Sequence, residues 1–174
     1  SLSQHPVNTD VIFSGTSAGT IIKSIDGGDT WKNIGNVIDG RITNIIFDAV
    51  REGTMYLLAG NKVYYSASTG TNWLEWEKEK TEEVRALNER ASDLSRQGFK
   101  VEADALRQSA RDLSERNRSD KAPQGIVLIV ADPVNSGVIY AGTNRGLFRS
   151  NSYGKYWSEV NIIESAKQFS IRSI

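Results

Sequence analysis

The sequence predicts a mainly β protein that is built from a repeated four-stranded unit and interrupted by an antiparallel α-helical hairpin. Three observations support this class. One phrase occurs three times with a single spacing, each copy ends in a polar turn before a tryptophan, and one central segment changes to helical periodicity. The 174 residues are enough for a small repeat array with an appendage.

The repeated phrase covers residues 6–31, 49–73 and 133–157. The first copy is introduced by His-Pro-Val-Asn-Thr-Asp-Val-Ile-Phe and the third by Asp-Pro-Val-Asn-Ser-Gly-Val-Ile-Tyr. The second is degenerate and reads Asp-Ala-Val-Arg-Glu-Gly-Thr-Met-Tyr. Chance is a poor explanation for this agreement, so we expect the chain to repeat one supersecondary unit.

Each copy predicts short strands that are joined by turns. A short apolar strand is expected at residues 20–24, 62–66 and 146–150, and the tryptophan after each following turn begins another strand. Further apolar strands are expected at residues 41–47, 125–130 and 169–174. Four strands in about 42 residues is the length of a β-propeller blade.

Residues 75–121 interrupt the repeats with a highly charged segment in which Gly98 is the one glycine. Apolar residues recur there in steps of three and four: Val84, Leu87, Ala91 and Leu94, then Phe99, Ala103, Leu106, Ala110 and Leu113. This spacing predicts two antiparallel helices over residues 77–118. The charged faces of the hairpin are interpreted as a solvated surface or, alternatively, as a docking surface for a partner.

The predicted domains are propeller blades at residues 1–76, the helical hairpin at 77–121, and a blade with the first strand of the next at 122–174. The first copy supplies only the second, third and fourth strands of its blade in this interpretation. The strands amount to about three blades, which enclose too narrow an axis for twisted sheets with tryptophan-sized side chains. We therefore expect either part of a larger propeller or a homo-oligomer in which each C-terminal strand completes its neighbour's first blade.

The turn before each tryptophan carries a sequence motif. The first copy reads S-x-D-x-G-x-T-W, and the other two keep the serine, glycine and tryptophan but replace the aspartate by serine. The motif residues are Ser24, Asp26, Gly28, Thr30 and Trp31, then Ser66, Gly70 and Trp73, and finally Ser150, Gly154 and Trp157. The motif resembles the Asp-box (BNR) repeat of sialidases, sortilin-type receptors, xyloglucan hydrolases and the photosystem II assembly factor propeller. The resemblance implies a β-propeller fold outside the helical segment.

Physical chemistry accounts for this motif as scaffold. An Asp or Ser side chain accepts hydrogen bonds from nearby backbone amides, and glycine adopts positive φ in a tight turn. The three tryptophans are large enough to fill the wedge between adjacent blades, so we expect them to be mostly buried. A catalytic or calcium-binding role for Asp26 and Asp29 is the weaker alternative, because calcium takes roughly six to eight oxygen ligands and the other copies lack the carboxylate.

Chain direction places two kinds of connection at one end of a blade: the turn between its second and third strands, and the connection to the next blade. The Asp-box turns lie at the other end. Seven polar residues at the first end are the candidate binding residues: Ser17, Asp39, Arg41, Asn61, Lys62, Asn144 and Arg145. The helical hairpin follows a connection of the same end, which predicts a binding surface for a protein or a glycan.

Composition excludes several classes of partner. The 21 basic and 21 acidic residues balance, so no net field draws the chain to nucleic acid or to an anionic membrane. The chain has no cysteine for disulfides or thiolate metal sites, and no apolar segment long enough to span a bilayer. The sequence predicts neither a cofactor nor a metal.

The residues for glycoside hydrolysis are not apparent in this chain. Most glycosidases need two carboxyl groups across one cleft, whereas Asp39 is a single carboxylate among the candidate binding residues. We therefore predict a non-catalytic interaction propeller that binds a protein or a glycan. The alternative is a fragment of a sialidase-like or xyloglucanase-like glycoside hydrolase whose catalytic residues lie outside this chain. The family resemblance implies export to the periplasm, the cell surface or the medium.

Overall fold

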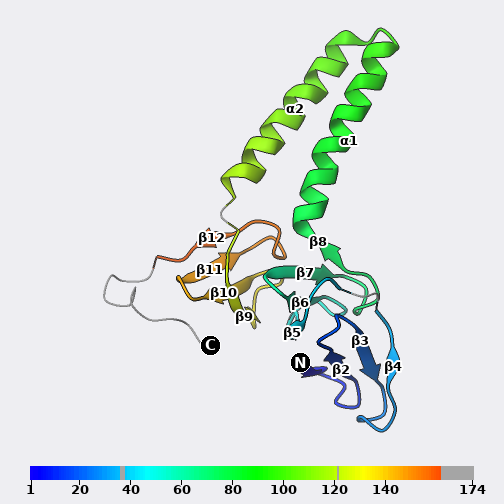
Figure 1. The fold of residues 1–174 in the computed structure, drawn as a ribbon, viewed down its shortest axis with the longest axis vertical. Helices are drawn as coiled ribbons and strands as arrows, with labels where there is room; N and C mark the ends of the chain where they lie inside the picture. Colours follow the sequence, from blue (N-terminus) through cyan, green and yellow to red (C-terminus); the bar gives the residue numbers. More distant parts are fainter. Residues whose placement is uncertain (36–37, 121, 162–174) are drawn as a thin grey trace. The chain divides into compact units, whose positions relative to one another are not determined.

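A computed structural model describes residues 1–35, 38–120 and 122–161. The chain divides into two compact units, one formed by Ser1–Glu75 with Ala122–Ile174 and the other by Trp76–Lys121. Within the described residues, the first unit contains three four-stranded sheets and the second contains two helices (Figure 1). The strand predicted at residues 169–174 lies outside the described residues.

Each sheet is an antiparallel meander in which strands adjacent in sequence are paired. The first sheet contains β1 (Leu2–Gln4), β2 (Ile12–Gly15), β3 (Ile21–Ser24) and β4 (Lys32–Asn33). The second contains β5 (Ile42–Phe47), β6 (Met55–Ala59), β7 (Lys62–Ser66) and β8 (Leu74–Glu75). The third contains β9 (Ile126–Ala131), β10 (Ile139–Thr143), β11 (Leu147–Ser150) and β12 (Ser158–Glu159). The sequence repeat therefore corresponds to one four-stranded sheet.

The first sheet is complete in itself, so the prediction that it lacks its first strand is wrong. β1 pairs with β2 in the register Leu2↔Ser14 and Gln4↔Ile12. The apolar pattern missed β1 because this strand has only three residues and Leu2 is exposed. A strand from a neighbouring copy would have to displace β1 to complete this sheet.

The second sheet lies between the other two, because β5 contacts β1 and β2 on one side and β9 on the other. A core cluster joins the first and second sheets and includes Phe13, Ile21, Ile42 and Met55, all buried. Burying a side chain of this size contributes about 1.5–3 kcal/mol. Gly15 permits close approach of the sheets, since a Cβ atom there would lie 2.3 Å from Cγ2 of Ile42.

A buried carboxylate joins the second sheet to the third. Oδ2 of Asp48 accepts hydrogen bonds from the Tyr56 hydroxyl (2.9 Å), the Ser136 hydroxyl (3.1 Å) and the Gly137 backbone N–H (2.9 Å). Its Oδ1 accepts from the backbone N–H groups of residues 50–51. Burial alone would raise the pKa of Asp48, but the backbone donors outweigh burial and hold that pKa below its ordinary value. Asp48 is therefore an ionised structural acceptor.

The equivalent positions in the other two sheets repeat the local part of this arrangement. Oδ1 of Asp132 accepts from the backbone N–H groups of residues 134–135 at 2.9 Å. Nδ1 of His5 accepts from those of residues 7–8 at 3.2 and 3.1 Å. The ring nitrogen of His5 therefore takes the place of a carboxylate oxygen.

The three turns before the tryptophans share their hydrogen bonds. In each turn the serine Oγ accepts from the glycine N–H: Ser24 from Gly28 (2.9 Å), Ser66 from Gly70 (3.2 Å) and Ser150 from Gly154 (3.0 Å). The side chain two residues after this serine accepts from the backbone N–H two residues after the glycine: Asp26 from Thr30 (2.9 Å), Ser68 from Asn72 (3.0 Å) and Ser152 from Tyr156 (2.9 Å). Serine therefore replaces aspartate as the acceptor without loss of the turn.

The prediction that all three tryptophans are mostly buried is wrong for Trp31, which is 40% exposed. In each turn the indole Nε1 donates to the glycine carbonyl at 2.9 Å, so each ring folds back on its own turn. Trp73 is partly buried and packs against the core cluster between the first and second sheets. Trp157 is also partly buried. Trp31 occupies in the first sheet the position that Trp73 occupies in the second, and none of the described sheets covers Trp31.

The helical unit contains α1 (Trp76–Arg96) and α2 (Lys100–Ser119), which pack along each other as the predicted hairpin (Figure 1). Small side chains of both helices are buried, namely Ala91, Ala103 and Ala110, and they allow the helices to approach closely. Nζ of Lys80, which is 3% exposed, lies 2.5 Å from Oδ2 of Asp120 and 2.8 Å from Oε1 of Glu77. Burial would lower the pKa of Lys80, but these carboxylates outweigh it and raise that pKa.

Candidate functional site

The strand directions give the β unit two ends. We define the loop end by the turns β2–β3, β6–β7 and β10–β11 and by the connection from β4 to β5. The turn end carries the turns β1–β2, β5–β6 and β9–β10 together with the three turns before the tryptophans. The chain leaves β8 at the loop end before it enters α1.

Backbone hydrogen bonds tie the loops of the loop end together. The Ile38 N–H donates to Gly19 O at 2.7 Å, which joins the β4–β5 connection to the β2–β3 turn. The Gly60 N–H donates to Arg41 O at 3.2 Å, which joins the same connection to the β6–β7 turn. Gly19 has a φ of 78°, and a Cβ atom there would lie 1.9 Å from Ile38 O, so only glycine fits this crossing.

All seven candidate binding residues are exposed. Their places are the β2–β3 turn for Ser17, the β4–β5 connection for Asp39 and Arg41, the β6–β7 turn and the start of β7 for Asn61 and Lys62, and the β10–β11 turn for Asn144 and Arg145. The bonded loops bring the first five into one region over the first two sheets. The other two belong to a separate turn of the third sheet.

An ion pair at the loop end involves one residue that the sequence reasoning missed. Nζ of Lys62 lies 2.7 Å from Oε1 of Glu75, and this hydrogen bond raises the pKa of Lys62. The negative charge of Asp39, in the β4–β5 connection, also raises the pKa of Lys62. The signal that would have found Glu75 is its position on the short strand β8, which pairs with β7.

Tyr64 lies between these charged groups and the core. It is the cross-strand partner of Glu75, and its side chain is buried in the core cluster. Burial is the main cause that raises the pKa of Tyr64, and the carboxylate of Glu75 adds to it. Among the described residues, its hydroxyl has no hydrogen-bond partner. The phenol is therefore held neutral beneath a polar surface.

The β10–β11 turn is organised by a buried threonine. Oγ1 of Thr143 accepts from the backbone N–H groups of Arg145 and Gly146, both at 3.0 Å, and donates to Gly146 O at 2.9 Å. These bonds fix the backbone from which Asn144 and Arg145 project. Thr16 serves the β2–β3 turn similarly, since its Oγ1 accepts the Thr20 N–H at 3.0 Å.

The loop end offers hydrogen-bonding and charged groups without a metal-binding cluster. No group of three or more metal-ligating side chains occurs within the part of the chain that the structure describes. Asp39 and Glu75 are the carboxylates of the Lys62 region, and Glu75 forms an ion pair with Lys62. This arrangement suits recognition of a polar ligand.

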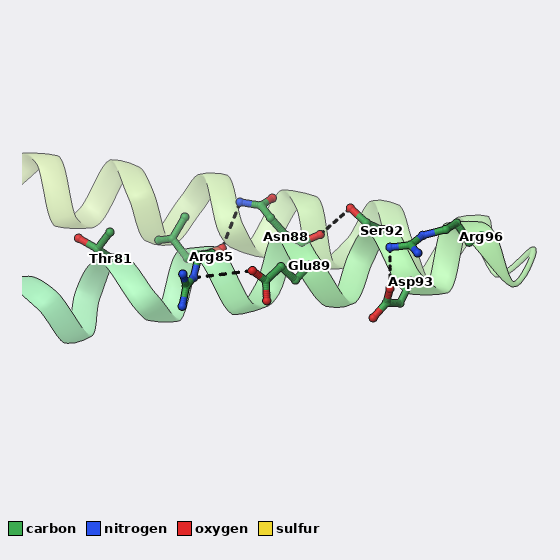
Figure 2. A pocket seen from close by; sticks show the side chains of 8 residues that line it. Thr81, Arg85, Asn88, Glu89, Ser92, Asp93 and Arg96 are labelled. Carbon is green, nitrogen blue, oxygen red and sulfur yellow. Dashed lines mark hydrogen bonds and ion pairs between the residues drawn. The ribbon is translucent and has the colours of Figure 1, made fainter.

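The helical unit presents a groove of about 760 Å³ along α1 (Figure 2). Its polar side chains pair along the helix: Asn88 Nδ2 donates to Val84 O at 3.1 Å, and Arg96 pairs with Asp93 at 2.9 Å. Figure 2 shows Arg85 directed toward Glu89 on the same helix. Such i,i+3 and i,i+4 pairs are typical of an exposed helix face. Neither described helix is long and apolar enough to cross a membrane.

Comparison with known proteins finds similarity over part of the chain. No family model matches it. A probable oligoxyloglucan-reducing end-specific xyloglucanase of Neosartorya fischeri is 34% identical over 79 residues, which are 41% of this chain and 10% of that protein. An oligoxyloglucan-reducing end-specific xyloglucanase of Emericella nidulans is 28% identical over 92 residues, 45% of this chain and 11% of that protein. The chain thus spans about a tenth of these relatives.

Solved structures show the fold. An ancestral GH74 enzyme matches 95% of this chain with a TM-score of 0.57 and 15% identity, over 19% of its own length. YCF48 from Cyanidioschyzon merolae matches 95% of this chain with a TM-score of 0.57 and 13% identity, over 38% of its own length. YCF48 bound to a D1 peptide matches 91% with a TM-score of 0.50 and 15% identity, over 43% of that chain. The three sheets are therefore blades of the β-propeller type.

Proposed function

We propose that this chain belongs to a non-catalytic propeller of the Asp-box kind that binds a protein or a glycan at its loop end. The observation that carries the proposal is the group of exposed polar residues that the bonded loops of the first two sheets hold together. Exposed polar side chains on loops that a rigid scaffold positions are a common basis of recognition. The helical insertion, at residues 77–121, is proposed to contribute to the same interaction, and the module is proposed to be exported.

The two kinds of similar protein support the two kinds of ligand. One solved structure is YCF48 with a D1 peptide, and the sequence relatives are named for xyloglucan oligosaccharides. A peptide presents backbone carbonyl and N–H groups, and a saccharide presents hydroxyl groups and ring oxygens. Both sets match the amide of Asn61 and the charged donors of Arg41 and Lys62.

Binding is tested with a glycan array and a phage-displayed peptide library as probes. The double variant Arg41→Ala/Lys62→Ala removes two positive charges from the loop end. The control Lys32→Ala/Arg149→Ala removes two exposed charges from strands instead. We expect the first variant to lose the selected ligands and the control to keep them. Equal binding by both variants would contradict the loop-end proposal.

The second candidate function is that of a glycoside hydrolase fragment whose catalytic residues lie outside this chain. The similarity to the xyloglucanases favours it. Incubation of a longer protein that contains this chain with xyloglucan oligosaccharides, followed by mass spectrometry, separates the two functions. An interaction module binds without cleavage. Cleavage by the longer protein, but not by the 174-residue chain, would establish the hydrolase fragment.

A further inference from the structure

One face of the first sheet is apolar, and none of the described sheets covers it. Side chains of directly paired residues point to the same face of a sheet, and Ser14 pairs with both Leu2 and Ile22. We call this surface the open face and define it by four apolar residues: Leu2, Ile12, Ile22 and Trp31. Leu2 is 70% exposed, so the open face has the character of an interaction surface.

The second and third sheets have the same face, and there it is buried. The strand registers show which residues correspond, because Ile12 pairs with the motif serine Ser24 as one residue does in each other sheet. The residues equivalent to Leu2 and Ile12 are at most 4% exposed: Ile45 and Met55 in the second sheet, Ile129 and Ile139 in the third. Apolar residues thus recur at these positions in all three copies, and the first copy presents them to solvent.

An aromatic ring of the first sheet covers the motif turn of the second sheet. A Cβ atom on Gly70 of this turn would lie 3.3 Å from Cε1 of Phe13. On Gly28, the equivalent glycine of the first sheet, a Cβ atom would lie 3.9 Å from both Ile12 and Trp31, and no side chain of another described sheet is within 4 Å. The open face therefore has the apolar strand residue and the tryptophan of this packing, and a ring from a neighbouring sheet would complete it.

The third sheet carries a ring at the position that corresponds to Phe13. Tyr140 follows Ile139 on β10 as Phe13 follows Ile12 on β2, and Tyr56 has this position on β6. Successive residues of a strand point to opposite faces, so Tyr140 points away from the buried face that contains Ile139. We call this surface the far face of the third sheet, and its residues are all partly buried: Leu128, Val130, Tyr140 and Leu147.

We propose that the open face binds the far face of the third sheet in a second copy of this chain. The partner's Tyr140 then occupies over Gly28 the place that Phe13 occupies over Gly70. The chain itself indicates this occupant, because the first sheet already covers the second through the corresponding pair of faces. The contact joins two different surfaces, so it is a head-to-tail contact. It uses sheet faces and is independent of ligand binding at the loop end.

The first test measures the mass of the 174-residue chain by light scattering from about 1 µM to about 1 mM, a range that covers the dissociation constants of modest interfaces. We expect the mass to rise from one chain to two or more chains. Trp31 is then exposed in the dilute chain and buried in the associated one.

A charged open face should prevent this association. Leu2→Lys/Trp31→Lys replaces two exposed residues of the open face and should raise the dissociation constant at least about tenfold, as loss of a central aromatic contact does. The control Val50→Lys/Val134→Lys replaces two exposed apolar residues of the turn end and adds the same charge. The control should associate like the unaltered chain. Circular dichroism establishes that each variant is folded.

A mixing experiment tests whether two different faces meet. Tyr140→Lys blocks the far face and should not associate with itself, whereas Tyr140→Phe keeps the ring and should associate like the unaltered chain. An equimolar mixture of Tyr140→Lys with Leu2→Lys/Trp31→Lys contains one intact pair of faces, so we expect it to form a heterodimer. If Tyr140→Lys does not fold, Leu147→Lys replaces it.

Four results would overturn the proposal. They are a mass of one chain at every concentration, undiminished association of Leu2→Lys/Trp31→Lys, loss of association in the control, and absence of the heterodimer from the mixture.

Discussion

At the scale of single residues, most polar side chains of the repeat serve as acceptors for backbone N–H groups. An imidazole nitrogen takes the place of a carboxylate among His5, Asp48 and Asp132, and a hydroxyl takes the place of a carboxylate in two of the motif turns. This exchange was predictable for the motif turns, because serine replaces aspartate in two of them. It was not predictable for Asp48, since its bonds to the third sheet join residues that are far apart in sequence.

Asp26 should make stability depend on pH in the acid range. Hydrogen bonds from the Thr30 hydroxyl and then the Ser24 hydroxyl lower the pKa of Asp26 to about 2 from 3.8. A group whose pKa is lower in the folded state stabilises the fold above its unfolded pKa, and this contribution disappears as the pH falls from about 4 to about 2. The variant Asp26→Ser, which copies the other two turns, should fold and lack this part of the pH dependence. Urea unfolding at pH 5 and pH 2.5 measures the difference between the two proteins.

Asp48 and Asp132 form a matched pair for the joint between sheets. Asp48→Ala should lower the free energy of unfolding by about 3 to 5 kcal/mol, because it leaves several buried donors without an acceptor. Asp132→Ala removes only exposed local turn bonds and should cost about 1 kcal/mol. Chemical denaturation measures both values. Equal costs would show that the bonds from Asp48 to the third sheet contribute nothing.

The tryptophans should differ in their contribution to stability. Trp73→Ala removes an indole that packs against the core and should cost about 3 to 5 kcal/mol, whereas Trp31→Ala should cost about 1 kcal/mol because Trp31 is exposed. Trp157, which is partly buried, should lie closer to Trp73. A cost for Trp31 as large as that for Trp73 would mean that another surface covers Trp31 in solution. Chemical denaturation of the three variants measures these free energies of unfolding.

At the scale of elements, long patterns were predicted better than short ones. The apolar steps of three and four residues placed the helices within one residue of α1 and α2 at each outer end. The apolar runs also located β5, β7 and β9 closely. By contrast, β1 has three residues of which two are exposed, so no periodicity marks it. Its existence depends on pairing with β2, which is a tertiary contact.

The helical hairpin should be removable. Contacts divide the chain into a unit at Trp76–Lys121 and a unit formed by the remaining residues, and each has its own buried side chains. A deletion that joins Glu75 to Gln124 through a short glycine linker should therefore keep the β signal in circular dichroism and lose the helical signal. A deleted protein that fails to fold would show that the β unit depends on the helices.

At the scale of the whole molecule, the sequence repeat predicted propeller-type blades, and the comparison with solved propellers agrees with it. The arrangement of the loop end followed from strand direction alone. The ion pair of Lys62 with Glu75 did not, because it depends on the register in which β8 pairs with β7.

The pairing of β1 makes a prediction about assembly. Because β1 already occupies the first position of the first sheet, deletion of residues 169–174 should leave the mass of the particle in light scattering unchanged apart from the residues removed. A dimer that dissociates on this deletion would restore the strand-exchange model derived from the sequence.

Asp48, the carboxylate that joins the second and third sheets, is also expected to control the separation of the third sheet from the other two. Ile42 donates a backbone hydrogen bond to Thr16 between the first two sheets, but within the described residues no such bond crosses to the third sheet. The third sheet is also separated from the second along the chain by the two helices. It is therefore expected to separate as one cooperative unit, with faster amide hydrogen exchange than the other two. Acid should widen that difference, because protonation of Asp48 removes the acceptor that holds this blade closed.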